Sequence, residues 1–189
     1  MINFLQVTFA LAGALLVNMP ASAQQKLVPA QSEIVFVSKQ MGVPVEGRFK
    51  KFDAQMNFDP KNMPTSKVAF TVDLASADLG NAETERELTK PGWFDTSKFA
   101  QATFASSAMK SLGGGRFEVA GKLAIKGNLR DVVVPVTVTQ AGGISTARGE
   151  MVLKRLEFKI GDGDWNDPSL VANEVTVKFK LAVTGMAPL

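Results

Sequence analysis

Residues 115–139 read GRFEVAGKLAIKGNLRDVVVPVTVT, and this stretch decides the fold class. Apolar residues or glycine occupy every second position from 117 to 125, and valines do so from 132 to 138. Alternation with a period of two is typical of strands that bury one face. The residues between the two runs, Lys126-Gly127-Asn128, are typical of a tight turn. The stretch therefore predicts a β-hairpin of two long antiparallel strands.

The same alternation extends outward from this hairpin in both directions. Six further segments carry it: residues 33–39, 45–58, 67–75, 101–109, 145–156 and 174–183. In the segment 45–58 the phase changes at Lys50-Lys51, which predicts a bulge that bends a long strand around a corner. Pro135 lies inside an alternating run, so that strand is predicted to be an edge strand or to be locally broken. Gly142-Gly143 predicts another turn.

One short helix interrupts the strands. Asn81 is a suitable N-cap, Glu83 and Glu85 fall in the first turns, and Pro91-Gly92 ends the helix. Eight antiparallel strands with one alternating face predict an all-β protein that forms a small closed barrel. A two-sheet sandwich gives much the same sequence pattern, so it remains the alternative architecture.

Composition excludes several classes of function. The chain has 189 residues, of which 46% are hydrophobic and 21% charged, which suits one domain with a substantial core. It has no Cys and no His, so a disulfide, a thiol nucleophile, a Cys/His zinc site and a His-based catalytic triad are excluded. The net charge of +3 is mild, and nucleic acid is not an expected partner. We expect no catalytic and no metal-binding residue.

The N-terminal segment predicts export. Residues 4–17 form an apolar run of signal-peptide length, and Ala21-Ser22-Ala23 fits an A-x-A cleavage site. The absence of Lys and Arg before the run departs from the usual pattern, and an uncleaved anchor is the alternative, although the run is short for a bilayer span. We therefore expect a signal peptide over residues 1–23, cleaved after Ala23, and an exported domain over residues 24–189.

Phenylalanine dominates the predicted inner face of the strands. Six of these residues share the inward phase: Phe36, Phe49, Phe70, Phe104, Phe117 and Phe179. For any single phenylalanine the favoured interpretation is a filled core, and the wall of an apolar lumen is the alternative. A barrel of eight strands is near the size at which side chains either fill the interior or leave room for one ligand. Composition alone leaves both interpretations open.

Several motifs together resemble the YceI-like family. They are the segment 43–49 (VPVEGRF), Gly92-Trp93-Phe94-Asp95, the segment 121–127 (GKLAIKG), and the segment 153–161 (LKRLEFKIG). Their order and spacing match over residues 27–181. The resemblance implies a lipocalin-like antiparallel barrel whose extended apolar tunnel binds polyisoprenoids, including isoprenoid quinones. Many members of the family are periplasmic, which makes the periplasm the expected location.

The resemblance also suggests which residues contact a ligand. The expected tunnel residues are Phe36, Met41, Phe49, Phe70, Phe94, Phe104, Phe117, Leu123, Phe158 and Phe179. The expected residues at the tunnel mouth are Gln40, Arg155 and Trp165. Family members often carry His at the position of Gln40, whose amide can exchange a hydrogen bond but does not titrate.

The expected function is therefore that of a binding protein. It would hold a polyisoprenoid or isoprenoid quinone for transport, storage or sequestration, with transient membrane contact, no catalysis and no cofactor other than the bound lipid. One alternative is a periplasmic interaction protein that docks on a membrane quinone or cytochrome system. Another is a lipid-modifying enzyme that uses the same cavity. The acidic segment 162–167 is interpreted as a solvated turn, with a weak Ca²⁺ site as the alternative.

Overall fold

The structure is a computed structural model, and it describes residues 24–189. Its strands are β1 (Lys26–Leu27), β2 (Glu33–Gln40), β3 (Val43–Phe49), β4 (Phe52–Asn57), β5 (Lys67–Asp73), β6 (Ala77–Asp78), β7 (Gln101–Gly113), β8 (Arg116–Ile125), β9 (Asn128–Ala141), β10 (Ile144–Lys154) and β11 (Glu174–Thr184). The single α-helix is α1 (Ala82–Leu88). Short 3₁₀ segments are η1 (Pro29–Gln31), η2 (Met63–Thr65), η3 (Leu74–Ser76), η4 (Arg155–Phe158) and η5 (Gly163–Trp165). The predicted signal peptide, residues 1–23, lies outside the described residues.

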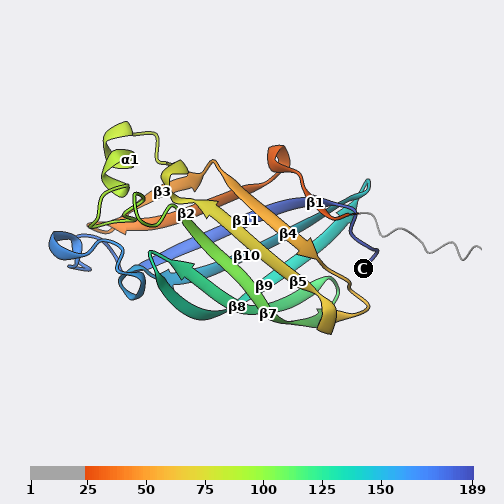
Figure 1. The fold of residues 1–189 in the computed structure, drawn as a ribbon. Helices are drawn as coiled ribbons and strands as arrows, with labels where there is room; N and C mark the ends of the chain where they lie inside the picture. Colours follow the sequence, from red (N-terminus) through yellow and green to blue (C-terminus); the bar gives the residue numbers. More distant parts are fainter. Residues whose placement is uncertain (1–23) are drawn as a thin grey trace, which may run out of the picture.

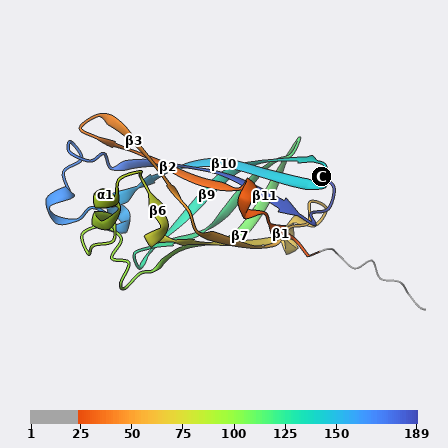
Figure 2. The ribbon, with the colours of Figure 1, turned by 90° about the horizontal axis from the view of Figure 1, so that it is seen from above.

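All strands belong to one strongly curled antiparallel sheet (Figure 1). The strand order is β4-β5-β7-β8-β9-β10-β11-β2-β3-β6, and β1 pairs with β11. Seen from above, β10 runs along one side of the molecule and β7 along the other (Figure 2). The predicted all-β barrel is confirmed, and the single sheet decides against the sandwich. The sheet has 11 strands rather than eight, because one predicted strand is bent into β3 and β4 and because β1 and β6 are two-residue pairings.

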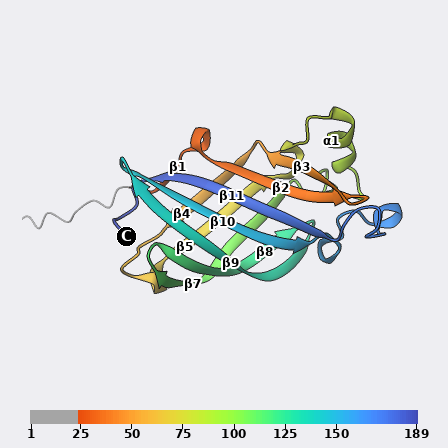
Figure 3. The same cartoon turned by 180° about the vertical axis from the view of Figure 1, so that it is seen from behind.

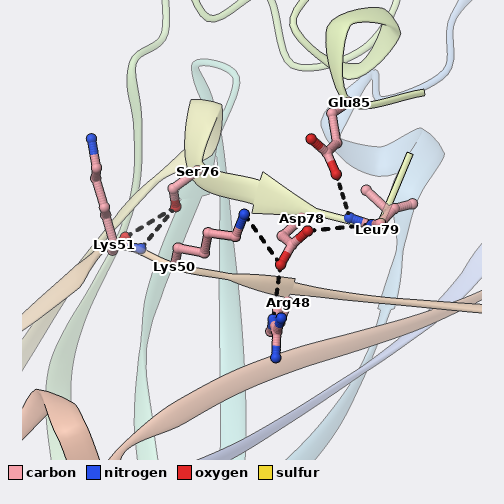
Figure 4. Close-up of polar contacts among 8 residues, drawn as sticks. Arg48, Lys50, Lys51, Ser76, Asp78, Leu79 and Glu85 are labelled. Carbon is pink, nitrogen blue, oxygen red and sulfur yellow. Dashed lines mark hydrogen bonds and ion pairs between the residues drawn. The ribbon is translucent and has the colours of Figure 1, made fainter. Parts of the chain in front are cut away.

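The bend between β3 and β4 joins the two ends of this sheet. β3 pairs with β6, whereas β4 pairs with β5, so the chain changes partner at Lys50-Lys51. Ser76 holds the corner: its carbonyl oxygen accepts a hydrogen bond from Lys50 N at 3.1 Å, and its Oγ accepts one from Lys51 N at 3.0 Å (Figure 4). The predicted bend is confirmed, and it closes the curled sheet around an interior.

Pro135 breaks the sheet on one side only. β9 pairs with β8 along the whole length of β8, and Pro135 lies opposite Glu118. Its pairing with β10 stops at the pair Gly149–Val136, one residue before Pro135. A proline has no N–H to donate, so the ladder ends there and the two strands separate. The prediction of a locally broken strand is confirmed, although β9 is an interior strand rather than an edge.

Local signals place the turns and the helix as expected. The β8–β9 turn is Lys126-Gly127 and the β9–β10 turn is Gly142-Gly143, all with positive φ. Asn81 caps α1, because its side chain accepts hydrogen bonds from the backbone N–H groups of Glu83 and Thr84, both at 3.0 Å. Among residues 24–189, no helix is long and apolar enough to cross a membrane.

The barrel has two distinct ends (Figure 3). We call the end that carries α1, residues 89–100 and residues 155–173 the helix end. The opposite end carries the β7–β8 and β9–β10 turns and the C-terminus, and we call it the terminal end (Figure 1). A buried cluster lies toward each: Leu74, Phe94, Leu123 and Phe158 are part of the helix-end cluster, and Phe58, Phe117 and Val138 form the other.

Candidate functional site

A cavity of about 800 Å³ runs through the barrel. Its wall includes Trp93 and Trp165 at the helix end and Phe58 and Met186 at the terminal end, so it extends between the two buried clusters. Most of the residues that border it are aliphatic, aromatic or methionine. Such a space accepts a long apolar ligand better than a polar one, because apolar walls leave polar groups without partners.

Three phenylalanines form the cavity wall by lying over glycines of the neighbouring strand. A Cβ added at Gly47 would lie 2.3 Å from the ring of Phe36. The same contact is 2.5 Å between Gly121 and Phe104, and 2.3 Å between Gly149 and Phe179. These distances are too short for any real Cβ, so only glycine allows the rings to lie against the strand in this way. The rings line the interior rather than fill it, which decides between the filled core and the open lumen.

The structure places every predicted site residue at this cavity. The bordering residues include Phe36, Met41, Phe49, Phe70, Phe94, Phe104, Phe117, Leu123, Phe158, Phe179, Gln40, Arg155 and Trp165. Their surroundings differ, however. Phe158 is 2% exposed within the helix-end cluster, whereas Met41 is 75% exposed in the β2–β3 turn. Met41 therefore lies at the rim of the cavity rather than inside it.

Arg155 is the most enclosed charged group at the helix end, with only 2% of its surface exposed. Its guanidinium donates five hydrogen bonds of 2.6–3.1 Å to backbone carbonyl oxygens. The acceptors are Ile160, Gly161, Trp165, Val171 and Ala172. An arginine has five N–H donors, so none remains for a ligand. Burial lowers the pKa of Arg155, and the charge of Asp162 opposes that shift. Arg155 therefore fixes the segment 160–172 at the helix end.

Lys126 makes a similar connection from the β8–β9 turn. Its Nζ donates hydrogen bonds to the carbonyl oxygens of Pro91 at 2.7 Å and Lys159 at 2.6 Å. Burial lowers the pKa of this amine, partly offset by the charges of Asp162 and Asp95. The loop that follows α1 and the turn that follows η4 are thereby attached to the same corner of the barrel.

The helix end also contains polar groups that the sequence-based analysis did not single out as site residues. Trp93 packs against Trp165, with ring centroids 5.8 Å apart, and is only 8% exposed. Trp93 Nε1 and Ser38 Oγ are both buried and have no hydrogen-bond partner among the described residues. Ser38 could have been found, because it shares the inward phase of Phe36 on β2. No periodic pattern marks Trp93, since it lies in a loop.

The terminal end is closed by aromatic packing. Phe58 and Phe117 meet edge to face with ring centroids 5.1 Å apart. Gln25 fixes Phe58 from outside the sheet, because its amide accepts a hydrogen bond from Phe58 N at 2.9 Å and donates one to Phe58 O at 2.7 Å. Phe58 was missed as a site residue although it ends the alternating segment 45–58 in the same phase as Met56, and it comes directly after the last residue of β4.

The acidic segment near η5 makes local turn contacts. The carboxylate of Asp167 accepts a hydrogen bond from Ser169 N at 2.8 Å, and this bond lowers the pKa of Asp167. Among residues 24–189, no group of three or more acidic side chains is arranged to hold a metal ion.

Comparison with known proteins relates this architecture to a family. The model of the YceI-like domain matches residues 25–183. A UPF0312 protein of Vibrio cholerae is 33% identical over 114 residues, which span 60% of this chain and 60% of that protein. The crystal structure of Burkholderia cenocepacia BcnA has 46% sequence identity and a TM-score of 0.80, covering 82% of this chain and 98% of that chain.

A more distant structure shares the fold alone. It is a polyisoprenoid binding domain from Saccharophagus degradans implicated in plant cell wall breakdown, with a TM-score of 0.70 and 17% identity over 87% of this chain and 99% of that chain. The family model covers nearly all of the described barrel, including both ends of its cavity. The resemblance read from the sequence motifs is thus confirmed, and the chain belongs to the YceI-like family.

Proposed function

We propose that this protein is an exported, non-catalytic lipid-binding protein of the periplasm that encloses a polyisoprenoid or isoprenoid quinone for transport, storage or sequestration. The observation that carries the proposal is the cavity of about 800 Å³, whose mainly apolar wall includes three phenylalanine rings laid over glycines. The polyisoprenoid binding domain of Saccharophagus degradans, which has the same fold, supports this choice of ligand class.

The physical chemistry of an isoprenoid tail favours a carrier that exchanges its ligand. Burying the tail gains about 0.8 kcal/mol per CH₂ relative to water. A bilayer offers a comparable gain, so the tail itself gives little preference for protein over membrane. Selectivity must then arise from packing along the cavity and from polar contacts at one end. Such a protein loads and unloads at a membrane instead of trapping the lipid.

Exposed apolar side chains at the helix end support transient membrane contact. Met41 is 75% exposed, Val43 64%, Leu170 41% and Trp165 40%. Met41 and Leu170 come from distant segments that meet, since Met41 N donates a hydrogen bond to Leu170 O at 2.9 Å. Met41, Trp165 and Leu170 border the cavity, at the end where a lipid would pass between the bilayer and the barrel.

The test is native mass spectrometry of the protein expressed with its leader, followed by solvent extraction and analysis of any added mass. We expect one isoprenoid lipid per chain. Met151→Trp fills the cavity from β10. It should abolish the lipid bound to the protein, because Met151 borders the interior. Val152→Trp is the matched control: Val152 is the next residue, is 56% exposed and points outward, so the lipid should be retained. An empty wild-type protein that also takes up neither quinones nor polyprenols would overturn the proposal.

A further inference from the structure

Two buried polar atoms at the helix end lack partners within the described chain. They are Trp93 Nε1, whose residue is 8% exposed, and Ser38 Oγ. Buried donors are nearly always hydrogen-bonded, because leaving one unsatisfied costs free energy. Both side chains border the cavity. The cavity is therefore the space from which a partner for these donors must come.

Both groups are connected to the segment that Arg155 organises. Ser38 is two residues before Gln40, which bridges to Val171, and Val171 O accepts a hydrogen bond from Arg155. Trp93 packs on Trp165, whose carbonyl oxygen accepts another hydrogen bond from Arg155. The same guanidinium thus fixes the backbone of Trp165, which packs on Trp93, and of Val171, which pairs with Gln40 two residues after Ser38. A ligand group entering here would meet a rigid, preorganised surface.

The charged side chains that border the cavity discriminate against an anionic ligand group. Among the described residues that border the cavity, Arg155 is the only cation, and all of its N–H groups are already used. Glu83 and Glu87 border the same cavity from α1. A phosphate or diphosphate would lose its hydration without gaining a free cation and would face two carboxylates. An uncharged acceptor, such as a carbonyl oxygen, avoids both costs.

We propose that Trp93 Nε1–H and Ser38 Oγ–H form a subsite for the head group of the bound lipid, and that this subsite selects an uncharged hydrogen-bond acceptor of the quinone class over a phosphate. The inference rests on the proposed function and deepens it. It places the head group at the helix end, with the tail extending toward Phe58 and Phe117. It also gives the two buried polar atoms of Trp93 and Ser38 a partner within the cavity.

The test compares three lipids on delipidated full-length mature protein: a long-chain isoprenoid benzoquinone, squalene as a hydrocarbon without a head group, and undecaprenyl phosphate. We expect the wild type to bind the quinone more tightly than either of the others. Ser38→Ala and Trp93→Phe should each weaken quinone binding about five- to tenfold. The preference for the quinone over squalene should fall by the same factor. Ser107→Ala, on the exposed side of β7, is the control and should change neither affinity.

An NMR measurement separates hydrogen bonding from packing. The protein has two tryptophans, and Trp93→Phe identifies the indole N–H signal of Trp93. That signal should move strongly downfield when the quinone binds and little when squalene binds. Equal affinity for quinone and squalene, an unmoved Trp93 signal, or phosphate binding as tight as quinone binding would overturn the inference while leaving the proposed function intact. Failure of the wild type to bind any of the three lipids would instead overturn the proposed function.

Discussion

The two ends of the tunnel are built on different principles. At the helix end, the loops are held by charged side chains that donate to backbone carbonyl oxygens, as Arg155 and Lys126 do. At the terminal end, Phe58 packs edge to face on Phe117, and the methionines Met63, Met109 and Met186 surround the buried cluster. One end is ordered by directional hydrogen bonds, and the other by adaptable apolar contacts.

This difference suggests how one cavity can recognise two parts of a lipid. Directional bonds hold the backbone rigidly beside the unpartnered groups of Trp93 and Ser38, which suits selection of a head group. Flexible methionine side chains around an aromatic pair can adjust to the end of a tail. The following substitutions test each half of the comparison, beginning with the largest expected effect.

Replacing Arg155 with Met should have the greatest effect, because it removes all five donors from buried or partly buried carbonyl oxygens. We expect the free energy of unfolding to fall by about 5 kcal/mol. Hydrogen exchange should accelerate first in residues 160–172, before the strands are affected. Arg130→Met is the control at the same end, since Arg130 is an exposed cation that donates to Glu157 O, and it should cost less than about 1 kcal/mol. Similar losses in both variants would contradict the special role of Arg155.

Phe117→Ala should destabilise the terminal end and open space there. It removes one ring of the Phe58–Phe117 pair, and we expect a loss of about 3 kcal/mol in the lipid-free protein. The space released lies beyond the end of the tail, so the variant should extract lipids with longer tails, as measured by mass spectrometry. Phe70→Ala is the comparison within the wall, where Phe70 packs on Phe104 at 6.3 Å. It also should change tail preference, though less. Unchanged extracted lipid and affinity in both variants would show that neither ring limits the ligand.

Gly47→Ala tests the arrangement of rings over glycines between the two ends. The three atoms nearest to the added Cβ all belong to the ring of Phe36, so the ring must turn into the cavity. We expect a loss of about 1–3 kcal/mol and reduced lipid occupancy. Gly92→Ala is the matched control, because its added Cβ would make an ordinary contact of 3.7 Å with Asp162 O. Occupancy equal to that of the wild type in Gly47→Ala would mean that Phe36 does not shape the lumen.

The smallest expected effect concerns the pairing of β3 with β6, beside α1. The hydrogen bond from Arg48 to Asp78, 2.9 Å long, is the main reason that the pKa of Asp78 is lowered to about 2 (Figure 4). Because this value is below that of an unfolded aspartate, the stabilisation is complete above about pH 4 and is lost as the pH falls through about 2. Asp78→Asn should therefore lower Tm slightly at pH 7, and the difference should shrink over this window. A difference that stays constant between pH 7 and pH 2 would contradict the assignment.

Much of the fold could be predicted because its signals are local. Alternation located the strands, Lys126-Gly127 and Gly142-Gly143 located two turns, and Asn81 located the start of α1. The phase change at Lys50-Lys51 even predicted the bend that closes the sheet. The short pairings β1 and β6 were missed, because two-residue strands have no periodicity.

The candidate site was only partly accessible from sequence. The inward phase and the family motifs identified residues that border the cavity, including Phe36, Phe104 and Phe179. Trp93 was missed because it lies in a loop, and Phe58 was missed although it continues the alternation predicted for residues 45–58. The role of Arg155 was also not visible, since its hydrogen-bond acceptors lie 5 to 17 positions further along the chain in irregular segments.

By itself, the sequence determined that this chain forms a series of antiparallel strands with an aromatic inner face, because strand periodicity and turn chemistry depend on neighbours along the chain. The single curled sheet was decided by the tertiary structure. Only the tertiary structure decided that the aromatic face encloses an open lumen. That outcome depends on register, which places Phe36 beside Gly47 and Phe179 beside Gly149 across neighbouring strands. A ring that lies over a glycine leaves space in front of it, whereas the same ring opposite a larger residue would project inward and fill that space.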